Sequence, residues 1–141
     1  HEAIIRKFRP WIDRGELLVL EDVSSAELRQ LYQHARATVC PSLGEGFDYS
    51  GVEAMMCGGA VVASDIAVHR EVFHDAAEYF SAYSSEALAG AIDAVIAPEG
   101  DARRRELVGR GAAVSRRYTP EAILPKWREF LLARARGRGA P

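Results

Sequence analysis

Short apolar runs alternate with amphipathic segments along most of the chain. Apolar runs at residues 17–20, 37–40 and 60–64 predict buried strands, and the segment "AEYF" predicts a fourth. Helical spacing of apolar positions predicts the intervening elements as helices, at residues 26–35, 51–57, 66–73 and 84–96. Such alternation is typical of right-handed βαβ crossovers. We therefore predict an α/β fold, a doubly wound, Rossmann-like parallel sheet covered on both faces.

Residues at the ends of these segments support the same boundaries. Ser24 and Glu27 have the spacing of a helix capping box. Pro41 cannot donate to a strand ladder and ends the run at 37–40, and Gly58 is placed to stop the helix before it.

The C-terminal segment, residues 119–136, predicts a closing amphipathic helix with Trp127, Phe130 and Leu131 on one face. That face either packs on this domain or crosses to another one. Residues 1–141 are interpreted as a single domain that is truncated at its N-terminal side, because His1 is not a methionine and the first segment resembles the end of a helix.

Composition limits the classes of function. With 48% hydrophobic residues the chain can bury a core, while it has no run of about 18 apolar residues and no signal peptide, so we expect a cytoplasmic protein. Residues 101–141 carry a net charge of +7 and residues 1–100 a net charge of −9. The basic part lacks the interleaved aromatic residues of a stacking platform, so we expect no nucleic acid partner.

A solvated helix face is the simpler interpretation of these basic residues. The alternative is peripheral contact with anionic lipid on the inner face of the plasma membrane, through five arginines. They are Arg103, Arg104, Arg105, Arg116 and Arg117.

Cysteine and histidine positions give no sign of a metal site. Cys40 and Cys57 lack a CxxC spacing and lie in apolar surroundings, which predicts two buried, reduced thiols. The histidines show no ligand spacing, and His69, next to Arg70 and Glu71, is predicted on a helix surface.

The segment "PSLGEGFDYSG" follows a predicted parallel strand, at the sheet edge where open α/β folds bind ligands. The helix after it offers unpaired amides and a positive dipole end to an anion, and Gly46 and Gly51 would allow close approach. Glu53 would repel a phosphate in the first helical turn, but it can accept both hydroxyls of a ribose. Glu45 could hold the hydroxyls of a sugar. The chain has neither GxGxxG nor a P-loop motif, which excludes those two phosphate-binding classes. An anion site together with a ribose-binding carboxylate indicates a nucleotide that carries another group.

The stretch "VCPSLGEGFDYSGVEAMMCGGAVVASD" closely resembles the carboxyl-terminal half of retaining glycosyltransferases of the GT-B fold, family 4, with their E-x7-E motif. The resemblance continues through "HREVFHDAAEYF" and "LAGAIDAVI". It implies transfer of a hexosyl unit from a nucleotide sugar to a glycan or lipid-linked acceptor in polysaccharide biosynthesis, with no metal or other cofactor.

The resemblance also implies a role for each motif residue. Glu53 would bind the ribose hydroxyls, and Glu45 would be the catalytic residue beside the donor sugar, holding it or its developing charge. The remaining donor contacts would come from backbone amides, facing sugar hydroxyls at Gly46, Phe47 and Asp48 and the pyrophosphate at Tyr49, Ser50 and Gly51.

Asp48 stands where the family often has glycine, and Tyr49–Ser50 replace an apolar residue and a proline. A carboxylate there would repel pyrophosphate unless it turns away or bonds to the sugar. The variant resembles O-antigen and other cell-surface polysaccharide transferases, several of which use GDP-mannose, which we take as the donor hypothesis. The family's diphosphate-binding Arg and Lys and its acceptor half belong upstream of residue 1, so we expect this chain to be inactive alone.

Two alternatives remain open. A retaining hydrolase could use Glu45 and Glu53 as acid and nucleophile, although a first-turn position favours the charged form of Glu53. A non-catalytic domain that binds a nucleotide sugar or another chain is the second alternative.

Overall fold

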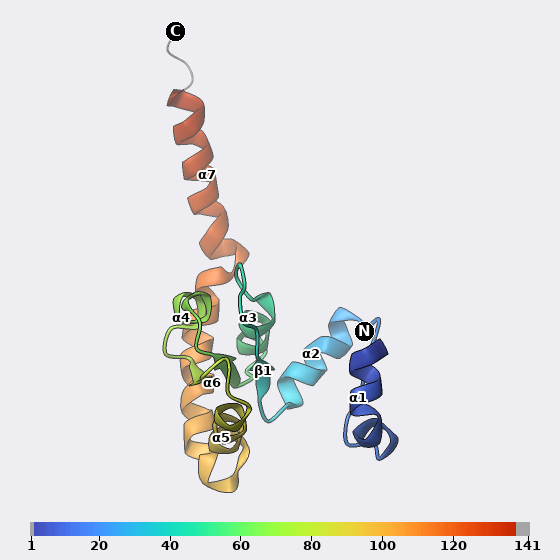
Figure 1. Ribbon diagram of the computed structural model, residues 1–141. Helices are drawn as coiled ribbons and strands as arrows, with labels where there is room; N and C mark the ends of the chain where they lie inside the picture. The colour runs from blue at the N-terminus through green and yellow to red at the C-terminus, as the bar shows by residue number, and fades with distance from the viewer. Residues whose placement is uncertain (1, 138–141) are drawn as a thin grey trace.

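A computed structural model describes residues 2–137 of the chain (Figure 1). The strands are β1 (Thr38–Cys40), β2 (Val61–Ser64) and β3 (Ala77–Phe80). The helices are α1 (Glu2–Asp13), α2 (Ser25–His34), α3 (Tyr49–Met56), α4 (Ala67–Phe73), α5 (Ser85–Ile96), α6 (Asp101–Ser115) and α7 (Pro120–Gly137), with 3₁₀ turns η1 (Pro98–Gly100) and η2 (Arg116–Tyr118).

The three strands form one parallel sheet in the order β1-β2-β3. Val39 pairs with Val62 in β2, and Val62 pairs with Glu78 in β3. All four residues of β2 are buried, as expected of the central strand in a sheet covered on both faces. The predicted doubly wound α/β fold is confirmed.

Two apolar clusters lie on opposite faces of this sheet. Val61 and Ala63 pack with residues of α3 and α4 on one face, and Val62 packs with residues of α5 on the other. Helix α6 contributes to both clusters, through Val114 and Leu107 respectively. The alternation of side chains along β2 therefore places α3 and α4 on one face of the sheet and α5 on the other.

Local signals placed the helix ends correctly. The Ser24 side chain accepts from the Glu27 amide, and the Glu27 carboxylate accepts from the Ser24 amide, which completes the capping box of α2. Gly58 has a φ of +80°, a left-handed conformation that ends α3 and that glycine adopts without strain.

The prediction of a strand at residues 17–20 is wrong. In the structure this segment is irregular, and Leu18, Val19 and Leu20 are exposed. A strand is stable only when it pairs with a neighbour. Among residues 2–137, β1 pairs with β2 alone, and Figure 1 shows α1 lying beyond α2, away from the sheet.

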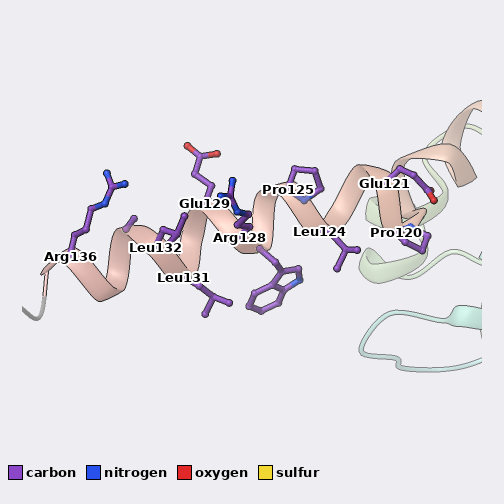
Figure 2. Close-up of a pocket in the computed structure, with 11 residues that line it drawn as sticks. Pro120, Glu121, Leu124, Pro125, Arg128, Glu129, Leu131, Leu132 and Arg136 are labelled. Carbon is purple, nitrogen blue, oxygen red and sulfur yellow. The ribbon is translucent and has the colours of Figure 1, made fainter.

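The predicted closing helix is present as α7, which extends away from the body of the domain (Figure 1). Its apolar face does not pack on this domain, because Trp127, Phe130 and Leu131 are each at least half exposed. Figure 2 shows side chains along α7 that border a hollow. A single helix lines that hollow, so it does not enclose a ligand.

Helix α6 was not predicted as a separate element, because charged residues dominate its sequence. The structure pairs several of its arginines with acids: Arg103 contacts Glu78 at 2.8 Å and Glu106 at 2.7 Å, and Arg110 contacts Asp75 at 3.1 Å. These pairs fit the simpler interpretation of a solvated basic face, and membrane contact stays a prediction. Within residues 2–137, no helix combines the length and apolarity needed to cross a bilayer.

Replacement of Gly51 by alanine should destabilise the domain. A Cβ atom there would clash with Cζ of Phe73, whose ring is fully buried. Overpacking of this kind costs about 1–3 kcal/mol, measurable as a lower urea midpoint. Gly90→Ala is the control, because its Cβ meets nothing within 4 Å and alanine favours a helix at this exposed position of α5. Equal effects of the two changes would contradict the prediction.

Candidate functional site

The loop from residue 41 to residue 48, here named the β1–α3 loop, leaves the carboxyl end of β1 and enters the first turn of α3. Glu45 on this loop and Glu53 in α3 are both exposed. The Glu45 carboxylate accepts a hydrogen bond of 2.7 Å from the Ser42 hydroxyl. Glu53 lies near the Tyr32 phenol, on which its charge acts. Both motif glutamates are thus accessible to a ligand above the sheet edge.

Asp48 is the N-cap of α3 and has a φ of +62°. Glycine adopts this left-handed conformation freely and aspartate tolerates it, so an aspartate can occupy a position where glycine is common. Its Oδ1 atom accepts from the Gly51 amide at 3.3 Å. The side chain is only 6% exposed, so its carboxylate is turned into the protein.

The prediction that His69 lies on a helix surface is wrong, because its side chain is completely buried. Nε2 lies 3.0 Å from Oδ2 of Asp48, without the alignment of a regular hydrogen bond. Nδ1 lies 2.8 Å from the Ser64 carbonyl oxygen and 3.1 Å from Ser64 Oγ. His69, Val72 and Phe73 have the i, i+3, i+4 spacing of one helix face, a signal that could have located His69 in the core.

Ser64 connects His69 to the start of the β1–α3 loop. Its hydroxyl donates to the Ser42 carbonyl oxygen. Cys40 completes the group, because its thiol interacts with the Asp48 carboxylate. Cys40, Asp48, Ser64 and His69 are named the buried polar cluster below.

Burial governs the acidity of two groups around this cluster. Burial first, and then the Asp48 carboxylate, raises the pKa of the Cys40 thiol far above its ordinary value. Burial also raises the pKa of Tyr32, which interacts with the Ser50 side chain. Both groups are therefore neutral at physiological pH. Cys40 and Cys57 are free, but Cys57 is half-buried rather than buried.

Aromatic contacts support the outer side of the loop. The Phe47 ring lies 4.8 Å from that of Tyr49 and 5.0 Å from that of Tyr118, edge to face in the second case. The Tyr118 hydroxyl donates to the Val72 carbonyl oxygen at 3.2 Å. Tyr49 is 73% exposed, so its ring is available to a ligand or partner.

The amides of the loop differ in their environment. The Gly51 amide donates to Asp48, and Gly51 is buried against Phe73, so packing accounts for this glycine. A Cβ at Gly46 would meet no atom within 4 Å. The first amides of any helix lack intrahelical partners, and the Asp48 cap takes up one of them.

The sequence profile of the family described as "Glycosyl transferases group 1" matches residues 14–112, more than half of the chain, including the whole β1–α3 loop and the buried polar cluster. The chain belongs to this family. Its sheet and loop are those of the Rossmann-like carboxyl-terminal domain of a GT-B glycosyltransferase.

Parts of the chain are similar to three proteins whose names state an activity. It is 41% identical over 66 residues to the O-antigen chain mannosyltransferase RfbU of Salmonella typhimurium, covering 47% of this chain and 19% of that protein. It is 33% identical over 104 residues to the alpha-maltose-1-phosphate synthase of Mycolicibacterium smegmatis, covering 68% and 27% respectively. It is 33% identical over 78 residues to the serotype-specific mannosyltransferase WbdA of Escherichia coli, covering 55% and 10%. The chain thus spans less than a third of these relatives.

Cys40 should resist alkylation in the folded glycosyltransferase domain. Its thiol is buried and its raised pKa leaves little thiolate even at mildly alkaline pH. In a Cys57→Ser variant, iodoacetamide should modify Cys40 only after denaturant is added, which mass spectrometry can follow. The matched Cys40→Ser variant should react faster while folded, through the half-buried Cys57. Rapid modification of folded Cys40 would show that the cluster is open to solvent.

Proposed function

We propose that this chain is the donor-binding half of a retaining, family 4 glycosyltransferase that transfers a hexosyl unit, mannose in the first instance, to a glycan or lipid-linked acceptor. The observation that carries the proposal is the placement of Glu45 and Glu53. Both are exposed beside a loop that joins the carboxyl end of a parallel strand to a helix N-terminus. Ligands of open α/β sheets bind at this edge.

The proposed donor contacts divide by chemistry. Glu53 accepts the two hydroxyls of the ribose, and Glu45 accepts hydroxyls of the donor sugar. The pyrophosphate lies along the N-terminal amides of α3, where the helix dipole favours negative charge. Because the Asp48 carboxylate is turned inward onto Gly51 and His69, it does not point toward that charge.

The same arrangement supports a dissociative transfer step. Charge develops on the leaving diphosphate as the bond to the anomeric carbon breaks, and fixed amides and a helix N-terminus stabilise such charge. Glu45 would hold the sugar or its developing positive charge on the other side. We propose no metal and no other cofactor for this step.

The names of the relatives support mannose as the transferred sugar. Two of the three relatives described above are named mannosyltransferases. The third is named for an alpha-maltose-1-phosphate product, so a glucosyl donor is the comparison to test. Polysaccharide biosynthesis is the corresponding proposal for the pathway.

A hydrolase is less well supported by the geometry. A general acid needs an apolar environment that keeps its carboxyl group protonated. Glu45 and Glu53 are both exposed, and Glu45 accepts from a hydroxyl. The non-catalytic alternative, a domain that binds a nucleotide sugar or another chain, predicts no sugar transfer by the complete protein. In its nucleotide-sugar form it still predicts binding of the donor.

Glu53→Ala should weaken nucleotide binding about tenfold or more, because it removes a charged acceptor of two hydroxyl groups. Calorimetric titration of the chain with GDP, UDP, GDP-mannose and UDP-glucose measures the change and also identifies the base. Glu86→Ala is the control, since Glu86 is an exposed first-turn acid of a different helix, α5. Unchanged affinity in Glu53→Ala would contradict the ribose role.

Glu45→Gln should weaken only the ligands that carry a sugar. GDP-mannose or UDP-glucose would lose about tenfold in affinity while the bare diphosphates bind as before, because the Glu45 carboxylate is assigned to the sugar. The same titrations provide both values for each nucleotide. A parallel loss for GDP or UDP would place Glu45 on the nucleotide instead.

A further inference from the structure

The side chains of His69 and Asp48 form a buried pair and take no part in the donor contacts proposed above. Both side chains are almost or completely excluded from solvent, at 0% and 6% exposure. They come from different elements, α4 and the end of the β1–α3 loop. Burying two ionisable groups is costly unless each is satisfied, so their arrangement has a physical consequence.

The hydrogen-bond partners determine how many protons the pair holds. Nδ1 of His69 lies 2.8 Å from the Ser64 carbonyl oxygen, which can only accept, so Nδ1 carries a proton. If Nε2 carried none, its lone pair would face an ionised Asp48 oxygen at 3.0 Å. Two acceptors at this distance repel each other in a buried site. One proton must therefore lie on Nε2 or on Asp48.

The other titratable groups near Asp48 do not provide the proton that the pair requires. The thiol of Cys40 on β1 interacts with Asp48 and stays protonated, because its pKa is raised. The phenol of Tyr32 on α2 is neutral for the same reason. Glu45 and Glu53, the other acids that act on these groups, are exposed and add negative charge. His69 is the basic group that faces Asp48 from α4.

The pair acts on both ends of the β1–α3 loop. At the far end, Asp48 holds a left-handed conformation and bonds to the Gly51 amide, which sets the direction of the first turn of α3. At the near end, the Ser64 carbonyl oxygen accepts a hydrogen bond from Nδ1 of His69, and the Ser64 hydroxyl donates to the Ser42 carbonyl oxygen. His69 is thus linked to the loop that carries Glu45 and to the start of the helix that carries Glu53 and the unpaired amides.

We propose that His69 is a positioning residue for the donor site: its close contact with Asp48, which requires one proton on the pair, holds the β1–α3 loop in the conformation that presents the α3 amides and both motif glutamates. The ligand in this proposal rests on the proposed function. The proton of the pair and the loop conformation do not, and they can be tested without any nucleotide.

A double-mutant cycle tests the coupling. His69→Phe leaves the Asp48 carboxylate buried without its proton partner, so the affinity for GDP or UDP should fall about tenfold. Glycine at position 48 adopts the left-handed conformation unaided and leaves no carboxylate. In the Asp48→Gly background, His69→Phe should therefore change affinity by less than about twofold. An equal loss in both backgrounds would overturn the proposal.

Two further variants separate positioning from general stability. Val95→Ala removes buried apolar volume in the cluster on the other sheet face and should lower the thermal midpoint without lowering affinity. His69→Gln keeps a side-chain donor near Asp48 and should recover part of the affinity lost in His69→Phe. If the phenylalanine variant does not fold, the affinity of His69→Gln is compared with that of the wild type instead. Failure of His69→Gln to bind better than a folded His69→Phe would also count against the proposal.

Nuclear magnetic resonance of the wild-type chain without ligand tests the proton directly. At neutral pH, either the His69 Nε2 ¹⁵N shift or the Asp48 carboxyl ¹³C shift should be that of the protonated form, and His69→Gln should shift the Gly51 amide signal. An unprotonated Nε2 together with an ionised Asp48 would overturn the proposal. If the protonated signal is seen and no nucleotide binds, the proposed function fails and the loop role of His69 stands.

Discussion

The structure depends most on one constraint: the polar groups beneath the β1–α3 loop are buried and must satisfy one another. Ser42, Ser64, His69 and Asp48 connect the loops that follow β1 and β2, at the edge where parallel strands end. A parallel sheet aligns these loops, but it does not set their conformation. The buried polar cluster does so, because a displaced loop would leave a carboxylate, an imidazole and a carbonyl without partners in a region that water does not reach.

Much of the sheet and most helices could be predicted from the sequence, because their signals are local. The run at 60–64 is apolar on both faces, as a central strand requires, and Ser24, Glu27 and Gly58 mark helix ends through their own side chain or backbone freedom. The run at 17–20 has similar composition and is not a strand. The difference is a pairing partner, which is a property of the assembled sheet and is not encoded in four residues.

The exposure of the two candidate glutamates could be predicted from the sequence, and the surroundings of Asp48 and His69 could not. The spacing of Glu45 and Glu53 locates both on one loop and helix, and both are exposed. The prediction for His69 relied on its sequence neighbours Arg70 and Glu71, which are polar. The residues that share its helix face are three and four positions later and include Phe73, against which its ring stacks. Asp48 looked unfavourable beside a diphosphate. Its inward orientation depends on a backbone angle and on a histidine 21 positions later, and neither is visible from composition.

Tyr118 connects the projecting helix α7 to the candidate site. Tyr118 lies two residues before α7 begins at Pro120. Its ring packs on Phe47, and its hydroxyl donates a hydrogen bond to the Val72 carbonyl oxygen. An 18-residue helix is roughly 27 Å long, so α7 extends well away from the domain body while its first turn adjoins a residue that packs against the site loop. The position of α7 is therefore linked to that of the Phe47 ring by two residues of backbone and one edge-to-face ring contact.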